Sequence, residues 1–161
     1  EKAQALLESL KTQAQDAILD VRRLIYDLRP PALDDLGLIE ALRQSASRYE
    51  TGVLRFRFDV PQSLPELPAA VETAAYRIAQ EAMTNVVRHA QATFCTVRLS
   101  CTDTHLVVEV EDNGCGLSEH QPYGVGLHAM KERTTELNGL YMIKSLPDGG
   151  TLVQAKLPLQ V

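Results

Sequence analysis

Residues 106–116 read LVVEVEDNGCG, in which an alternating apolar stretch runs directly into a glycine loop. Leu106, Val108 and Val110 fall on one face of a predicted strand, and the same alternation places Asp112 on that apolar face. A carboxylate at the core-facing end of a strand is unfavourable unless a partner satisfies it. One fitting partner is an exocyclic amine such as that of adenine, because an ionised carboxylate only accepts hydrogen bonds. The alternative is that Asp112 caps its own glycine turn in an Asx-type role.

Periodicity on both sides of this stretch predicts further strands and helices. Strands are expected at about 54–60, 95–101, 140–145 and 151–157. Helices are expected from about Ala69 to Ala90, after a proline-spaced loop, and from about Leu127 to a C-cap at Asn138-Gly139. The fold class is therefore α+β, a two-layer α/β sandwich with mixed connections.

The first 28 residues carry apolar side chains in steps of four and three, from Ala3 to Leu28. Further apolar residues widen this stripe, as in a helix that packs in a bundle of three or more helices. Residues 1–28 are therefore expected to form one helix of a dimeric bundle, because alone the stripe would lie in water.

Prolines then end this helix at Arg29-Pro30-Pro31, because proline lacks the amide donor. Asp34 or Asp35 can cap a second, shorter helix. The predicted organisation is a partial dimerisation helix and linker helix over residues 1–50, followed by a second domain over residues 51–161.

Composition excludes several classes of protein. A net charge of -5 with scattered arginines leaves no electrostatic footprint for nucleic acid. No apolar run approaches the roughly 20 residues of a membrane span, so no membrane contact by this chain is expected. Three cysteines without CxxC spacing favour a reducing cytoplasm, although a parent protein could be membrane-anchored. Because the chain opens at Glu1 inside a helical pattern, we expect it to be a fragment.

On the helix expected at 69–90, Glu81 and Asn85 lie at the edge of the apolar face, and Arg88 and His89 close the same turn. Hard oxygen ligands together with cationic donors suit a site for Mg²⁺ and phosphates. The alternative is that these residues belong to a solvated face, with His89 near the helix C-terminus.

Four glycines follow, of which Gly114 and Gly116 allow backbone to approach a flat ligand, and Gly124 and Gly126 free amides at a helix start. Residues 124–129 match the relaxed dinucleotide pattern GxGxxA, but no strand leads directly into them. A GxxxxGK[ST] phosphate loop is also absent, so ATP binding would need another architecture.

These segments resemble, in order and spacing over residues 53–161, the motifs of the histidine-kinase-like ATPase superfamily, which has the Bergerat-type fold. Residues 81–90 resemble its N box, 112–117 its G1 box, 124–127 its G2 box and 149–151 its closing element. Residues 28–42 are similar to the linker of the nitrate-sensor-like class of sensor histidine kinases.

The resemblance implies ATP and Mg²⁺ as cofactors. It implies that Asn85 holds Mg²⁺ while Glu81 orders the water shell of the metal, and that Arg88 and His89 lie near the phosphates. Asp112 would accept the adenine amine, with Thr151 supporting it through a water. The remaining pocket residues would be Gly114, Gly116, Gly124, Gly126 and Leu127, with a mobile lid at roughly 117–123.

The implied activity is that of a protein histidine kinase in a two-component system. The chain would form a homodimer through the N-terminal bundle and serve a response regulator with helix-turn-helix output. The acceptor histidine normally lies on the first hairpin helix, whereas the four histidines here lie in the ATP domain: His89, His105, His120 and His128. We therefore expect ATP binding without self-phosphorylation.

Two other functions stay open. One is a superfamily ATPase or protein serine kinase of the anti-sigma-factor type, which would lack the heptad helix. The other is a non-catalytic dimerisation module with a vestigial pocket, although the acidic, amide and glycine positions are all present. Cys115 inside the glycine loop raises a further hypothesis of redox-sensitive ATP binding.

Overall fold

The computed structural model describes residues 29–117 and 124–160. The predicted helix 1–28 and all of the predicted lid except Leu117 lie outside these residues. The chain forms two compact units, Glu1–Pro31 and Ala32–Val161, and the description that follows concerns the second. Its elements are α2 (Pro31–Ser47), β1 (Arg55–Asp59), α3 (Ala69–Asn85), η1 (Val86–Ala90), β2 (Phe94–Cys101), β3 (His105–Asp112), α4 (Val125–Glu136), β4 (Leu140–Ser145) and β5 (Thr151–Pro158).

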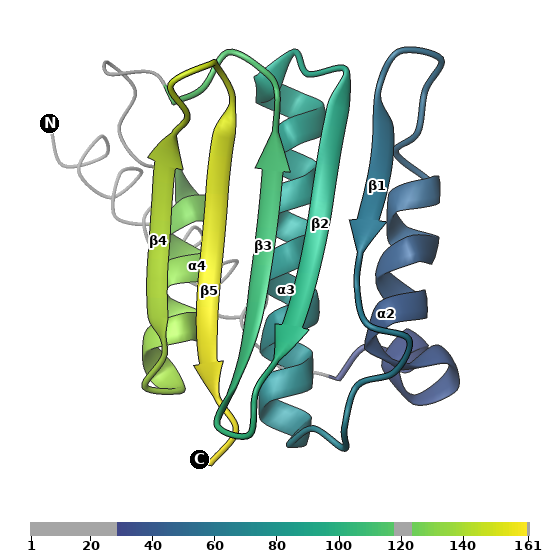
Figure 1. Cartoon of the computed structure of the whole chain (residues 1–161), viewed down its shortest axis with the longest axis vertical. Helices are drawn as coiled ribbons and strands as arrows, with labels where there is room; N and C mark the ends of the chain where they lie inside the picture. The colour runs from purple at the N-terminus through teal and green to yellow at the C-terminus, as the bar shows by residue number, and fades with distance from the viewer. Residues whose placement is uncertain (1–28, 118–123, 161) are drawn as a thin grey trace, which may run out of the picture. The chain divides into compact units, whose positions relative to one another are not determined.

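The strands form a five-stranded sheet in the order β1-β2-β3-β5-β4. The β1–β2 pair is parallel, and the pairs β2–β3, β3–β5 and β4–β5 are antiparallel. The helices α2, α3 and α4 all lie on one face of this sheet (Figure 1). The predicted two-layer sandwich is confirmed, and every predicted strand is present.

The core between the two layers follows the alternation in the strands. In β3, Leu106, Val108 and Val110 are buried and the residues between them are half-buried. The same parity buries Asp112 at the end of the strand, where only 6% of its surface is exposed. Asp112 is paired in register with Cys95 at the start of β2. The sequence-based placement of Asp112 on the core face is confirmed.

Helix α3 contributes Val71, Ala75, Ile78 and Ala82 to the core, as its periodicity predicts. Its last turn differs from the prediction of a regular helix to Ala90, because residues 86–90 form a π-helical turn, η1. At the first residue of this turn, the backbone N–H of Val86 is shared between the carbonyl oxygens of Ala82 and Met83. The carbonyl oxygen of Ala90 then accepts a hydrogen bond from Cys115 N at 2.8 Å.

Helix α2 packs into the core beneath the sheet. The helix begins at Pro31, whose missing N–H is tolerated at the first helical position, and Asp34 lies in its first turn. Capping by Asp34 or Asp35 stays a prediction. Gly37, with φ 73°, interrupts the helix. Buried α2 residues such as Leu33 and Leu42 join the core of the sheet, and Ala32–Val161 form one compact unit. The functional division between residues 50 and 51, in which the segment to residue 50 acts with a dimerisation unit, also stays a prediction.

Helix α4 begins at Val125, two residues before the predicted start, and its predicted C-terminal closure is confirmed. Asn138 adopts the left-handed conformation with φ 56°, and Gly139 N donates to Thr134 O at 2.8 Å. A Cβ on Gly139 would lie 2.6 Å from Lys156 O, so glycine is needed there for close packing against β5.

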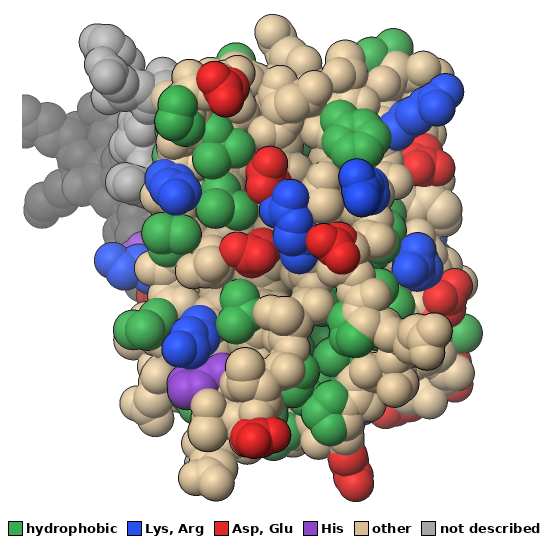
Figure 2. All heavy atoms as spheres, viewed as in Figure 1, with side chains coloured by type: hydrophobic (Ala, Val, Ile, Leu, Met, Phe, Trp, Pro, Cys, Tyr) green, Lys and Arg blue, Asp and Glu red, His purple; other side chains and the backbone are tan. Residues whose placement is uncertain are grey.

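The other face of the sheet carries charges of both signs over its middle strands (Figure 2). Arg98 of β2 lies 2.6 Å from Glu111 of β3 and 3.8 Å from Asp59 of β1. The hydrogen bond with Glu111 raises the pKa of Arg98. Within residues 29–117 and 124–160, no helix is long and apolar enough to cross a membrane.

Candidate functional site

Asp112 is the buried carboxylate at the centre of the candidate site. Its Oδ1 accepts a hydrogen bond from Gly114 N at 2.8 Å, so it does cap its own glycine loop. It also accepts hydrogen bonds from the backbone and side chain of Thr151, at the start of β5. Burial raises the pKa of Asp112, and the hydrogen bonds from Gly114 and Thr151 oppose that shift. The predicted pair Asp112 and Thr151 is therefore brought together.

Asn113 fixes the loop to the neighbouring strand. Its Oδ1 accepts from Thr93 N at 3.0 Å and from Phe94 N at 2.9 Å, and its Nδ2 donates to Thr93 Oγ1 at 3.0 Å. This residue was not predicted to be part of the site. Its place in an Asp-Asn-Gly string was the only available signal, because the partners lie 19 and 20 residues away.

The loop 112–116 is wedged between two turns that approach it backbone to backbone. A Cβ on Gly114 would overlap the carbonyl oxygen of Ala90, at the end of η1. A Cβ on Gly150, in the turn between β4 and β5, would overlap the carbonyl oxygen of Asp112. Gly150 also has φ 96°, a conformation that side chains disfavour. Glycine is thus required at both contacts.

The exit of the loop is held by a residue that the sequence analysis did not single out. Gly116 turns with φ 75°, and a Cβ there would lie 3.1 Å from Ser145 Oγ at the end of β4. The same oxygen accepts a hydrogen bond from Leu117 N at 2.9 Å. Ser145 therefore fixes the backbone where the described loop ends.

The helices α3 and α4 meet at Glu81 and Gly126. A Cβ on Gly126 would overlap Oε1 of Glu81, so the carboxylate lies directly against the first turn of α4. Gly124, the residue before α4, has open space around it and no side-chain cap. Leu127 is partly buried against the core. Glu81 is thus close to the glycine segment that sequence analysis assigned to the same pocket.

Asn85 ends the regular part of α3, and its Nδ2 is buried with no hydrogen-bond partner among the described residues. A buried amide without a partner is unfavourable by about 1–3 kcal/mol. Because rotation about the last side-chain bond exchanges the oxygen and the nitrogen, the amide can offer an oxygen to a cation. Asn85 and Glu81 therefore fit a Mg²⁺ ion that takes its remaining oxygen ligands from phosphates and water.

Arg88 and His89 both have exposed side chains on η1, next to Asn85 along the chain. Cys115 is exposed as well, and its Sγ lies 3.5 Å from the carbonyl oxygen of His89. In the described ranges, no cluster of three or more His, Cys, Asp and Glu residues could hold a metal by itself. A metal here would depend on a ligand for most of its coordination.

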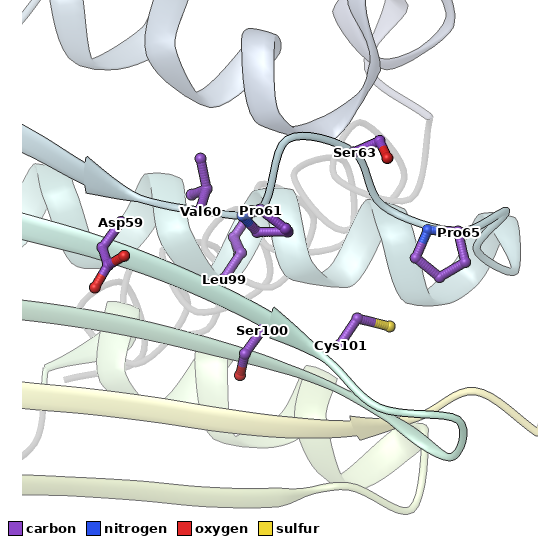
Figure 3. A pocket seen from close by; sticks show the side chains of 8 residues that line it. All are labelled: Asp59, Val60, Pro61, Ser63, Pro65, Leu99, Ser100 and Cys101. Carbon is purple, nitrogen blue, oxygen red and sulfur yellow. The ribbon is translucent and has the colours of Figure 1, made fainter.

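A cavity of about 440 Å³ lies at the opposite end of the sheet (Figure 3). Its lining comes from the end of β1, the loop that follows and the end of β2: Asp59, Val60, Pro61, Ser63, Pro65, Leu99, Ser100 and Cys101. Cys101 pairs with Leu106 at the start of β3, whereas Asp112 lies at its end. None of the predicted site residues lines this cavity.

The fold and the segments around Asp112 define an ATPase domain. Residues 70–161 match the family described as histidine kinase-, DNA gyrase B- and HSP90-like ATPases, and the chain belongs to this family. Its sequence relatives are sensor histidine kinases, and it corresponds to their catalytic ATPase domain. It is 35% identical over 157 residues to the histidine-protein kinase/phosphatase DegS of Brevibacillus brevis, covering 95% of this chain and 40% of DegS.

A second relative and the solved structures agree with this assignment. The sensor protein VraS of Staphylococcus aureus strain COL is 34% identical over 158 residues, covering 93% of this chain and 44% of VraS. The histidine kinase domain of the Erythrobacter litoralis EL346 blue-light activated kinase superposes with a TM-score of 0.66 at 20% identity, over 76% of this chain and 59% of that domain. The chain thus spans less than half the length of these sequence relatives.

Proposed function

We propose that the chain is the ATP-binding catalytic part of a two-component sensor histidine kinase of the nitrate-sensor-like class. It would transfer the γ-phosphate of ATP to a histidine on a separate helix, from which the phosphate passes to a response regulator. The observation that carries the proposal is the buried Asp112 carboxylate, held by Gly114 and Thr151. A buried acceptor fixed in orientation is suited to select an exocyclic amine.

In this proposal Asp112 accepts the adenine amine, and Thr151 holds the carboxylate in place. Gly114 and Gly116 keep the wall of the pocket free of side chains, and Gly124, Gly126 and Leu127 form the start of α4. Asn85 and Glu81 hold the metal and its water shell, while Arg88 and His89 bind the phosphates. Mg²⁺, when bound, would neutralise phosphate charge. Phosphoryl transfer depends mostly on positioning and charge, so no covalent residue of this domain is required.

The acceptor histidine is proposed to lie outside this chain. His105 lies at the start of β3, at the far end of that strand from Asp112, and its Nδ1 contacts Thr104 Oγ1 at 2.8 Å. His128 lies 3.2 Å from Glu132 on α4. His120 lies outside the described residues. We also propose homodimerisation through residues 1–28 and a partner regulator with helix-turn-helix output.

The proposal is tested first by calorimetric titration with a non-hydrolysable ATP analogue and Mg²⁺. Wild-type chain should bind, and Asn85→Ala should lose most of the Mg²⁺-dependent gain because it removes the metal-facing amide. Asp59→Asn, at the cavity end of the sheet, is the matched control and should bind like the wild type. The vestigial-pocket alternative predicts no binding by the wild-type chain.

Phosphotransfer is tested separately, by mixing the chain and labelled ATP with the helical hairpin of VraS. Acid-labile, base-stable label on the hairpin and none on this chain is the expected result. Label on a serine or threonine would favour the protein serine kinase alternative. Label on a histidine of residues 1–161 would contradict the proposed location of the acceptor.

A further inference from the structure

The segment that follows α2 makes a side-chain contact with the helix that carries Asn85. Tyr49 follows the end of α2, and its backbone N–H donates to Ala46 O at 2.8 Å. Its ring lies against Phe56 of β1, with centroids 6.4 Å apart. Its hydroxyl lies 3.1 Å from Thr84 Oγ1 on α3. Thr84 is the residue immediately before Asn85, so this contact reaches the last regular turn of α3.

The direction of this hydrogen bond follows from the second partner of Thr84. The Thr84 hydroxyl donates its single proton to the carbonyl oxygen of Gln80 at 2.8 Å. Tyr49 must therefore be the donor to Thr84 Oγ1. The result is a chain of two hydrogen bonds, from the Tyr49 hydroxyl through Thr84 to the backbone of α3, in which each bond strengthens the other.

The backbone around Asn85 is fixed by the buried residues Met83 and Val86, but its side-chain amide is less constrained. Directly after Asn85 the regular helix gives way to the π-helical turn η1. The buried Nδ2 of Asn85 has no hydrogen-bond partner among the described residues, so the amide is not held by its own contacts. The last regular turn of α3 is fixed from the side by Tyr49 and Thr84.

We infer that Tyr49 and Thr84 are positioning residues for the metal-binding amide of Asn85, and that the linker after α2 thereby adjusts the phosphoryl-transfer site. This inference rests on the proposed function. Tyr49 acts through Thr84 and does not contact the proposed ligands of the metal. The contact also links the linker region to the catalytic position, since α2 begins at Pro31, shortly after residues 1–28, and Tyr49 follows the end of α2.

The test uses the whole 161-residue chain with Tyr49→Phe, Thr84→Val, the double variant and Thr84→Ser. Each is titrated with the ATP analogue with and without Mg²⁺. Loss of one hydrogen bond of ordinary strength should lower the Mg²⁺-dependent gain in affinity roughly fivefold in each of the first two variants. The affinity without Mg²⁺ should not change. The double variant should lose no more than either single one, and Thr84→Ser should retain the wild-type gain.

Thr135→Val is the matched control. The Thr135 hydroxyl donates to Lys131 O at 2.9 Å, the same bond to the fourth preceding residue, on the exposed side of α4. This variant should keep the full Mg²⁺-dependent gain. Wild-type Mg²⁺ dependence in Tyr49→Phe and Thr84→Val, or additive losses in the double variant, would overturn the inference while the proposed function stands. If the wild-type chain fails to bind the analogue, the proposed function fails and the inference with it.

Discussion

The two ends of the sheet are built in different ways. At the end that holds Asp112, three turns meet through backbone contacts that only glycine allows, and a carboxylate is buried among hydrogen-bond donors. At the opposite end lies a cavity of about 440 Å³, lined in part by prolines, serines and the exposed carboxylate of Asp59 (Figure 3). That carboxylate forms a loose ion pair with Arg98 at 3.8 Å.

A cavity by itself does not define a functional site. The cavity end has volume, but its lining shows no buried charge and no backbone contact that excludes a side chain. The Asp112 end buries a carboxylate and has three positions, Gly114, Gly116 and Gly150, where a Cβ would meet close neighbours. Buried charge and strained backbone both destabilise a fold, so they are expected to persist only where they serve a function. Strain and buried charge therefore mark the Asp112 end as the candidate functional site.

The largest effect is expected at Gly150. Gly150→Ala would place a Cβ into the carbonyl oxygen of Asp112 at a backbone φ of 96°. We expect the free energy of unfolding in urea to fall by roughly 3 kcal/mol or more. Gly52→Ala is the control, because a Cβ there meets nothing within 4 Å and the change should stay under about 1 kcal/mol. Equal losses in the two variants would remove the distinction between strained and unstrained glycines.

The next effect is on binding and compares one carboxylate from each end. Asp112→Asn removes the charged acceptor, and a hydrogen bond to a charged group contributes about 1.5–3 kcal/mol. Affinity for the ATP analogue should therefore fall roughly 10- to 100-fold by calorimetry. Asp59→Asn should change it less than about twofold, because its ion pair with Arg98 is exposed and long. A similar loss in both variants would show that the charge acts at long range.

The pH dependence should follow the raised pKa of Asp112, which burial causes. As pH falls through this pKa, the carboxyl gains a proton and analogue affinity should weaken. The free energy of unfolding, in contrast, should increase as pH falls through the same range. The stabilising contribution of this group is fully present below its unfolded pKa and is lost as pH rises through the folded pKa. Titrations and urea curves from pH 4 upward should show both trends, and Asp112→Asn should flatten them.

The smallest effect concerns the thiols at the two ends. Cys115 is exposed in the glycine loop. At the cavity end, the pKa of Cys101 is raised, mainly by burial and to a smaller extent by the negative charge of Asp103. Cys95 is buried, and its pKa is raised to about 12. A maleimide should label Cys115 first, and the ATP analogue should slow that reaction several-fold without affecting Cys101. Equal protection of Cys101 would indicate that ligand also reaches the cavity.

Much of this fold follows from local patterns. Alternation in 106–112 predicts the strand and the burial of Asp112 together, because the period of two fixes which side chains face the core. Asn138-Gly139 predicts the end of α4 through the conformations these residues allow. The sequence also singles out Glu81, Asn85 and the loop glycines as site residues, and their roles stay predictions.

What could not be predicted depends on distant contacts. The π-turn at 86–90 accompanies the hydrogen bond from Cys115 to Ala90, residues that lie far apart along the chain. The same holds for Ser145, which accepts from Leu117, and for Tyr49, which contacts Thr84. No local propensity encodes these pairings, because each arises only when the sheet has brought the segments together.

The strand order leaves β1 and β4 as the two edge strands of the described sheet. Their sequences differ in how strongly they disfavour pairing with a strand of another molecule. β1 is only five residues long and presents exposed Arg55, Arg57 and Asp59, and charges of this kind discourage another strand from adding on. β4 reads LYMIKS, with four consecutive apolar residues, a single lysine and Leu140 71% exposed. Self-association into aggregates would therefore begin at β4, where a second lysine in place of Leu140 should improve solubility.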